Sequence, residues 1–398
     1  MGETTLNNLP PNWSWVKLGD VSEIVMGQSP PSSTYNTDQI GLPFFQGKAE
    51  FTELYPVVRK WCSEPNKVAE PLDILISVRA PVGSSNIANQ KCCIGRGLAA
   101  LRYPDCNKYI FYYFRLIEQK LDELGTGSTF KAISSATLRN VEIPLPPLPE
   151  QKKIVEKIEE LFSGLDSGVA SLKKAEEQIR LYRQSVLASA FSGKLLTQIA
   201  QRQAHSEMLK AAEPRLDYSN QLQTGWKWVK FNDFCKLQRG YDLPLKNILE
   251  GKYPVVTSGG INGYHKEYKA EGPCLVTGRS GSVGNIHFID IDYYWPHNTV
   301  LYVKDFCHNM PKFIYYYFRQ FNFKKFSSST AVPTLDRKKM YNEQVMIPTL
   351  VQQIQIVEEI EKRFSEADNL EKAIDESLVK SETLRQSILK KAFEGKLV

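Results

Sequence analysis

The fold is decided by the stretch IPLPPLPEQKKIVEKIEELFSG (residues 143–164), which leads on to RLYRQSVLASAFSGKLL (residues 180–196). The prolines favour an extended entry, and Pro149 suits a first helical turn because the N–H that it lacks would have no partner there. A helix over residues 150–191 would be about 60 Å long, too long for the core of a small domain. Its apolar or small residues recur in steps of three and four, the pattern of a coiled-coil seam. The seam residues are Ile158, Leu161, Leu165, Gly168, Leu172, Ala175, Ile179, Tyr182 and Val186.

A second copy of this stretch lies in the same chain. It begins IPTLVQQIQIVEEIEKRFSEADN (residues 347–369) and ends TLRQSILKKAFEGKLV (residues 383–398), and identical residues of the two copies stand 202 positions apart. A repeat of this length exceeds any solenoid period, so it predicts a duplicated unit of one domain and one helix. We expect the helix of residues 150–190 to pack antiparallel against that of residues 352–392.

Two glycines lie within the first predicted helix. Gly164 and Gly168 each cost about 1 kcal/mol in a helix interior. We therefore expect either a local break in the helix or a close approach of the second helix at these positions.

The globular parts repeat as well. They open with NWSWVKLGDV (residues 12–21) and GWKWVKFNDFC (residues 225–235). The alternation Trp-x-Trp-Val predicts a strand packed on a core. The aromatic runs KYIFYYFR (residues 108–115) and KFIYYYFR (residues 312–319) also correspond. Aromatic residues on all sides favour core packing in a buried helix or strand over a platform for base stacking.

Two further segments, DILISVRAPVGSSNIA (residues 73–88) and CLVTGRSGSVGNIHFI (residues 274–289), each present a strand, an arginine and a turn that ends in Val-Gly. Their glycines match neither GxGxxG nor GxxxxGK[ST], so β-turns are predicted rather than a phosphate-binding loop. A loop arginine has few roles in a core, whereas its planar fork suits guanine or phosphate. Arg79 and Arg279 are therefore candidate nucleic-acid contacts.

Polar loops precede both long helices, GTGSTFKAISSATLRNVEIPLP (residues 125–146) and SSSTAVPTLDRKKMYNEQVMIP (residues 327–348). Hydroxyl and basic side chains of this kind are common phosphate contacts, although a solvated charged face would have the same composition. The side chains concerned are Ser128, Thr129, Lys131, Arg139, Ser329, Thr330, Arg337, Lys338 and Lys339.

Composition indicates a two-domain protein without membrane segments. The chain has 398 residues, of which 42% are hydrophobic and 24% charged, and it contains neither a long apolar run nor an N-terminal signal sequence. We expect a cytoplasmic location. Seven cysteines and five histidines show no paired CxxC or HExxH spacing, which predicts reduced thiols and no metal site.

Charge separates the two globular parts. Residues 1–146 hold 14 basic and 14 acidic side chains, whereas residues 225–346 hold 17 and 10. A basic domain favours a polyanionic partner. We expect an α/β fold of the α+β type, divided into globular residues 1–146, a long helix 147–198, a linker 199–224 with one or two helical turns, globular residues 225–346 and a second long helix 347–398.

Together these segments resemble the specificity subunits of type I DNA restriction-modification systems. The resemblance covers nearly the whole chain through the Trp-x-Trp opening, LISVRAPVG and LVTGRSGSVG, the entry IPLPPLPEQKKIVEKIE and the exit RQSVLASAFSGKL. It implies two target recognition domains that each read half of a split DNA sequence, separated by two antiparallel helices that set the spacing and bind methyltransferase subunits. The second repeat departs from the pattern, since IPTLVQQ replaces the proline run.

The resemblance also implies a subunit without catalytic activity or cofactor. Two methyltransferase subunits would bind S-adenosylmethionine, restriction and translocase subunits would join the full complex, and the double-stranded target would be asymmetric. DNA contacts are expected at Arg79, Ser128, Thr129, Lys131, Arg279, Ser280, Ser329, Thr330 and Lys338. Methyltransferase contacts are expected at Gln151, Ile154, Phe162, Phe191, Lys194, Ile356, Phe364, Phe393 and Lys396.

Two other functions are weighed against this one. A methyltransferase would need an NPP[YF]-like motif and a glycine-rich cofactor loop, and the sequence has neither. A coiled-coil adaptor that does not bind DNA would leave the two globular parts, which make up most of the chain, without a role.

Overall fold

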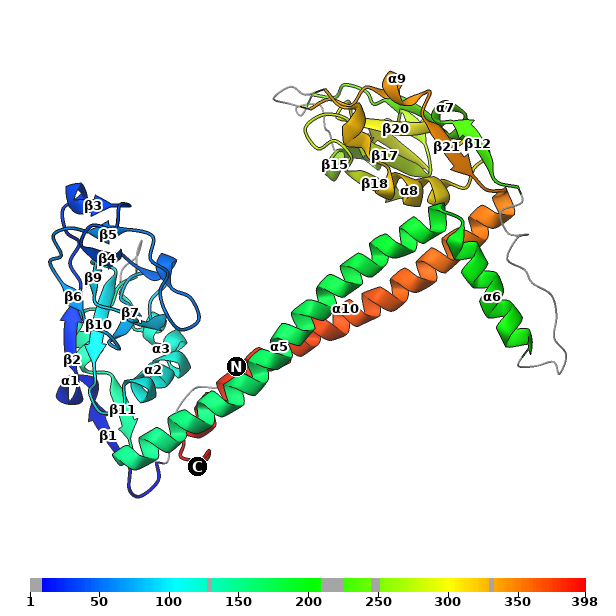
Figure 1. Cartoon of the computed structure of the whole chain (residues 1–398). Coiled ribbons are helices and arrows are strands. Elements are labelled where there is room, and N and C mark those ends of the chain that lie inside the picture. Colours follow the sequence, from blue (N-terminus) through cyan, green and yellow to red (C-terminus); the bar gives the residue numbers. More distant parts are fainter. Residues whose placement is uncertain (1–8, 127–130, 209–224, 245–250, 329–332) are drawn as a thin grey trace. The chain divides into compact units, whose positions relative to one another are not determined.

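A computed structural model describes residues 9–126, 131–208, 225–244, 251–328 and 333–398. The chain divides into two compact units, Met1–Lys173 with Asp375–Val398, and Lys174–Ile374. Each unit combines a globular α+β part with stretches of two long helices, α5 (Leu148–Phe191) and α10 (Leu350–Phe393), as Figure 1 shows. The predicted fold class is confirmed.

The described globular part of the first unit is built on three sheets. A two-stranded ribbon pairs β1 (Ser14–Lys17) with β11 (Glu142–Leu145), the strand that leads into α5. The other sheets have the orders β2-β10-β7-β8 and β3-β5-β4-β9-β6. Their strands are β2 (Glu23–Met26), β3 (Tyr35–Asn36), β4 (Leu42–Phe45), β5 (Trp61–Cys62), β6 (Val68–Ala69), β7 (Ile74–Ser77), β8 (Ser85–Ile87), β9 (Cys92–Ile94) and β10 (Leu98–Arg102). The helices are α1 (Leu18–Val21), α2 (Asn107–Leu116), α3 (Glu118–Glu123) and α4 (Ser135–Arg139).

The second unit repeats this plan in its described residues. Its ribbon pairs β12 (Lys227–Lys230) with β21 (Gln344–Ile347), and its two larger sheets have the orders β13-β20-β17-β18 and β15-β14-β19-β16. Their strands are β13 (Lys236–Arg239), β14 (Tyr253–Thr257), β15 (Gly260–His265), β16 (Ala270–Glu271), β17 (Cys274–Gly278), β18 (Ile286–Ile289), β19 (Tyr293–Pro296) and β20 (Val300–Asp305). The helices are α6 (Lys194–Met208), α7 (Phe231–Phe234), α8 (Pro311–Gln320) and α9 (Arg337–Met340).

The aromatic runs form α2 and α8, and both helices lie in the cores. Six consecutive residues of α2, Tyr109 to Phe114, are buried, so the predicted core packing is confirmed there. The buried Tyr109 hydroxyl donates a hydrogen bond to the Pro144 carbonyl at 2.6 Å, and its ring packs edge-on against Phe393 of α10. In α8 the corresponding burial involves Phe313, Ile314, Tyr316 and Phe318.

Each unit packs a segment of α5 against a segment of α10. In the first unit Asp166 of α5 pairs with Arg385 of α10. In the second unit Arg183 of α5 pairs with Asp368 of α10, with 2.6 Å between Arg183 Nη2 and Asp368 Oδ1. A residue further along α5 thus meets an earlier residue of α10, which confirms the predicted antiparallel pairing.

The two helix glycines behave differently from the prediction. Helix α5 is continuous through Gly164 and Gly168, and a Cβ atom added at either position would meet no atom within 4 Å. The expected break and the expected close approach are therefore both wrong. The helix instead ends near Gly193, whose φ of 79° is the left-handed conformation typical of helix ends. Helix α6 (Lys194–Met208) then covers residues 199–208 of the segment predicted as a linker.

The tryptophans and the seam are also more exposed than expected. Trp13 is buried just before β1, but Trp15 is 43% exposed and Trp228 66% exposed on their strands. The ribbon strand is as predicted, whereas core packing of its second tryptophan is wrong. In the seam Ile158 and Val186 are buried, while Gly168 and Tyr182 are exposed. Ile158 and Val186 pack into the cores of their units, which Gly168 and Tyr182 do not join. No described helix is long and apolar enough to span a bilayer.

Candidate nucleic-acid interface

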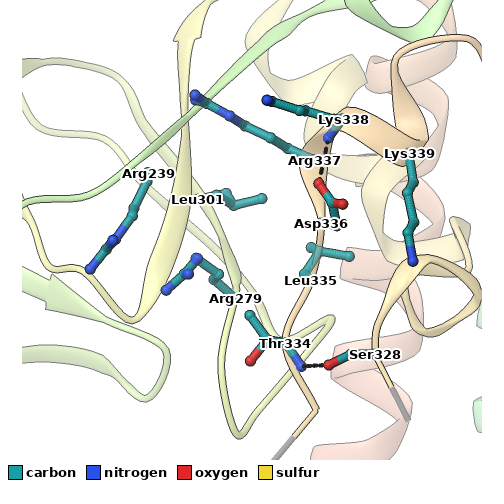
Figure 2. Close-up of a pocket in the computed structure, with 10 residues that line it drawn as sticks. All are labelled: Arg239, Arg279, Leu301, Ser328, Thr334, Leu335, Asp336, Arg337, Lys338 and Lys339. Atoms are coloured by element: carbon teal, nitrogen blue, oxygen red, sulfur yellow. Dashed lines mark hydrogen bonds between the residues drawn. The ribbon is translucent and has the colours of Figure 1, made fainter. Parts of the chain in front are cut away.

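A basic pocket of about 410 Å³ lies in the second unit, where β13 and β17 end and α9 begins. Figure 2 shows its lining, in which five cationic side chains come from these three segments. The lining residues are Arg239, Arg279, Leu301, Ser328, Thr334, Leu335, Asp336, Arg337, Lys338 and Lys339. Such a concentration of positive charge in a concave surface attracts anions.

Arg279 is held in place by its backbone. It directly follows β17, its N–H donates to the Thr299 carbonyl, and its carbonyl accepts from the Leu335 N–H, both at 2.8 Å. Among the residues that the structure describes, its guanidinium makes one long hydrogen bond of 3.4 Å, to the Asn298 carbonyl. Burial lowers the pKa of the Arg279 guanidinium, and the nearby charge of Arg239 lowers it further. An anion between the two side chains would relieve this repulsion.

Asp242 borders the same cluster. Its Oδ1 lies 3.4 Å from Arg239 Nη2 and also accepts a hydrogen bond from the Asn298 side chain. Its charge opposes the lowering of the Arg279 pKa. Because the Arg239 and Asp242 side chains are half or more exposed, this pair leaves most of the positive charge of the pocket uncompensated.

Helix α9 presents the remaining cations. The Asp336 carboxylate caps it by accepting from the Lys338 N–H at 3.0 Å, and Met340 is fully buried. These two contacts fix the short helix and leave Lys338 and Lys339 exposed. Arg337 is half-buried, because its Nη1 donates to the Leu237 carbonyl at 2.9 Å.

The loop arginines of the two units are not structural equivalents. In the first unit the Ile133 N–H donates to the Val78 carbonyl, just as the Leu335 N–H donates to that of Arg279. Arg279 therefore corresponds to Val78, which is buried. Arg79 corresponds to Ser280, since isolated bridges join Arg79 to Ala132 and Ser280 to Thr334. The expected correspondence of Arg79 with Arg279 is wrong by one residue.

The first unit has no cation at any of the five equivalent positions. Met26 ends β2 where Arg239 ends β13, because Gly27 and Gly240 follow with the same hydrogen bonds to the neighbouring strand. Val78 replaces Arg279. In α4, capped by Ser134 as α9 is by Asp336, the three α9 cations of the second unit are replaced by Ser135, Ala136 and Thr137.

The structure locates the remaining predicted DNA contacts as follows. Arg79 is exposed, and Lys131 pairs with Asp122 at 2.6 Å between Nζ and Oδ2. Ser280 lies beside the pocket through its bridge to Thr334. Four predicted contacts lie outside the described residues, namely Ser128, Thr129, Ser329 and Thr330. Sequence reasoning missed Arg239, although aligning KLQRG (residues 236–240) with EIVMG (residues 23–27) would have marked it as a basic replacement.

Most of the predicted methyltransferase contacts are interior residues. The structure buries Gln151, Ile154, Ile356, Phe364 and Phe393 within their own units, which corrects the expectation that these side chains face a partner. Gln151 accepts from the Tyr103 hydroxyl at 3.2 Å and donates to the Pro146 carbonyl at 2.9 Å. Their physical role is to attach the long helices to the globular parts. Phe162 and Phe191 are half-buried, and Lys194 and Lys396 are exposed.

No metal site is apparent in the described part of the chain, where no group of three or more histidine, cysteine, aspartate or glutamate side chains is placed to hold an ion.

Comparisons with known proteins converge on one family. Residues 10–176 and 223–380 match the family model described as the type I restriction modification DNA specificity domain. A Methanocaldococcus jannaschii protein named as the MjaX type I restriction enzyme specificity subunit is 42% identical over 198 residues, 48% of this chain and 46% of that protein. The EcoKI specificity subunit of Escherichia coli K12 is 24% identical over 434 residues, 98% of this chain and 90% of the relative.

Among solved structures, the HsdS subunit from Thermoanaerobacter tengcongensis is 54% identical, with 42% of this chain and 41% of that chain covered and a TM-score of 0.37. The match to the MjaX subunit thus spans about half the length of that protein, and the match to HsdS spans less than half of that chain. The match to the EcoKI subunit spans nine-tenths of that protein.

Proposed function

Because the chain belongs to the type I restriction modification DNA specificity domain family, we propose that it binds double-stranded DNA and supplies the sequence specificity of a type I restriction-modification complex. The observation that carries this proposal is the basic pocket, in which Arg279 and its four cationic neighbours line one concave surface. Arginine forks there can bind guanine edges or phosphates, and lysines can bind phosphates.

Each globular part would read one half of a bipartite, asymmetric target, and the helix pair would fix the gap between the halves. Arg279 is the base-reading candidate of the second unit, because its backbone is fixed while its guanidinium is nearly free. Arg79, exposed at the neighbouring loop position, is the candidate of the first unit. Ser280, Lys131 and Lys338 would add phosphate contacts.

Two methyltransferase subunits that bind S-adenosylmethionine, and restriction and translocase subunits, are the proposed protein partners. Their contacts on this chain would use exposed parts of the long helices, including Lys194 and Lys396 and the half-buried rings of Phe162 and Phe191. The chain itself would contribute recognition and leave methyl transfer to these partners.

Methylome sequencing with reconstituted methyltransferase tests this function. Arg279→Ala should weaken binding by about 1–3 kcal/mol and relax the bases read in one half of the target, and Arg79→Ala should do so in the other half. Lengthening α5 and α10 together should change the gap and leave the bases unchanged. The proposal is overturned if Arg279→Ala relaxes both halves, or if the purified chain alone methylates DNA.

A further inference from the structure

We propose that the second unit holds the DNA phosphate backbone with the three α9 cations of its basic pocket, Arg337, Lys338 and Lys339, and that the first unit binds its half-site without an equivalent phosphate clamp. The two halves of one target would then differ in salt dependence. This inference rests on the proposed function, since it concerns how the two recognition domains share the electrostatic part of DNA binding.

The cations of the pocket are available to a ligand. Among the described residues, Arg279, Arg337, Lys338 and Lys339 form no ion pair with a carboxylate. Asp336 uses a carboxylate oxygen to cap α9, and Asp242 pairs with the exposed side chain of Arg239 at 3.4 Å and accepts a hydrogen bond from Asn298. The pocket therefore keeps a net positive charge that phosphates can neutralise.

The first unit keeps the frame of this site without a cation at the five equivalent positions. Ser134 caps α4 through the Thr137 N–H at 3.0 Å, and Leu138 is fully buried as Met340 is in α9. Lys131 near the corresponding loop is paired with Asp122, while the exposed Arg79 and Arg139 stand at positions that carry Ser280 and Tyr341 in the second unit. Because both helices begin after a capping side chain and bury their fourth residue, the uncharged residues reflect a difference in surface chemistry rather than in fold.

Two possibilities other than a phosphate clamp fit the pocket less well. A catalytic role would need a general base or nucleophile among the cations, and the two nearby carboxylates already serve as helix cap and arginine partner. A small anionic ligand would need an enclosed cavity, whereas Lys338 and Lys339 project from an exposed helix surface. An open basic surface on a recognition domain suits a polymer with repeating phosphates.

The expected effect can be stated as a salt slope. Each phosphate neutralised by a protein cation contributes about 0.9 to the slope of log K against log salt concentration. Removing the three cations of α9 should therefore reduce the slope by about 2.7. The sequence read in the second half should change less than the affinity, because phosphate contacts carry no direct sequence information.

The chain supplies its own replacement residues for the test. Arg337→Ser with Lys338→Ala and Lys339→Thr gives α9 the surface of α4, and Ser135→Arg with Ala136→Lys and Thr137→Lys gives α4 the surface of α9. A control with equal charge loss on α10 is Lys362→Ala with Lys372→Ala and Lys380→Ala. Binding of the full chain to its target duplex would be measured by fluorescence anisotropy at several salt concentrations.

We expect the α9 replacement to lower the slope by about 2.7, the α4 replacement to raise it, and the α10 control to leave it unchanged. A slope that is the same in the α9 variant and the unmodified chain overturns the clamp while leaving the proposed function intact. An equal fall in the α10 control also overturns it, because net charge alone would then explain the effect. If the unmodified chain binds no duplex, with or without methyltransferase, the proposed function itself fails.

Discussion

The second unit repeats the attachment of helix to globular part found in the first unit, whereas the surface around its basic pocket carries a different set of side chains. Lys108 pairs with Glu159 of α5, and Lys312 pairs with Glu361 of α10, both with 2.6 Å between the charged atoms. At the pocket, by contrast, all five cations of the second unit are replaced in the first. The interior contacts that define the unit are retained, while the surface that would meet DNA differs.

An arginine links the two helices in each unit. The Arg385 guanidinium lies 4.9 Å from the centre of the Phe162 ring and pairs with Asp166. The Arg183 guanidinium lies 5.1 Å from the Phe364 ring and pairs with Asp368 and Glu371. Each helix thus provides the arginine of one unit and the ring of the other, which is the reciprocity expected of an internal twofold repeat.

The buried glutamines that attach the long helices to the globular parts, Gln151 and Gln353, differ in the number of hydrogen bonds that they form. Gln353 accepts from the Met310 N–H at 2.8 Å and donates to the Asn309 side chain at 2.7 Å and the Pro348 carbonyl at 3.2 Å. Gln151 makes two such bonds. The two units therefore place a glutamine at the same position of the long helix, but the second unit depends on more hydrogen bonds from it.

The largest effect is expected at these buried glutamines. Gln353→Leu should destabilise the second unit by about 3 kcal/mol, because it leaves buried backbone groups without partners. Gln151→Leu should cost the first unit about 2 kcal/mol. Urea unfolding combined with hydrogen exchange would assign each loss to its unit. Gln355→Leu, at an exposed position of α10, is the control. Equal losses of stability at all three positions would contradict the idea that the number of buried hydrogen bonds determines the size of the loss.

The arginines should have the next largest effect. Arg183→Ala should cost about 2 kcal/mol, because it removes two charge-assisted hydrogen bonds and a ring contact. Arg385→Ala should cost about 1 kcal/mol, because its loss also relieves repulsion with Arg115, whose pKa is lowered chiefly by burial and further by the Arg385 charge. Thermal unfolding of both variants would measure the difference, with Arg183→Lys retaining the charge but not the planar fork. A larger loss for Arg385→Ala would reverse this ranking.

The smallest effect is expected from the glycines of α5, which the second helix lacks. Gly164→Ala and Gly168→Ala should each raise the free energy of unfolding by up to about 1 kcal/mol, because alanine favours helix and meets no neighbour. Gly395→Ala should have the opposite sign, since its φ is 67° and its Cβ would collide with Pro10. Urea unfolding would measure these changes. A lower free energy of unfolding for either α5 variant would contradict the open space found around Gly164 and Gly168.

The long helices and their antiparallel pairing can be predicted from the sequence, because the 202-residue repeat and the three-and-four spacing depend on local periodicity and on identical residues. The burial of α2 and α8 can also be predicted, since aromatic residues of these helices lie on all of their faces. Exposure of Trp15 cannot, because alternation shows which residues share a face of a strand but not whether another layer covers that face.

The candidate site was less accessible to sequence reasoning. Arg279 could be singled out because it stands among glycine and serine, and Lys338 because it lies in a basic loop. Arg239 comes from a distant segment, and only the strand pairing of the fold brings it to Arg279. The misalignment of Arg79 arose because arginine was matched to arginine. Backbone hydrogen bonds match Gly83 to Gly284, and counting back from these glycines pairs Arg79 with Ser280.

The loops of residues 78–83 and 279–284 close in the same way, although they carry different side chains. Gly83 and Gly284 both have positive φ, and each donates its N–H back to the residue that begins its loop, Ser77 or Gly278. VRAPVG (residues 78–83) and RSGSVG (residues 279–284) therefore fill equal lengths of chain between matching closures. Residues 79–81 and 280–282 could therefore be exchanged between the units while the sheets and helices keep their sequence, whereas the first loop position is a buried valine in one unit and a half-buried arginine in the other.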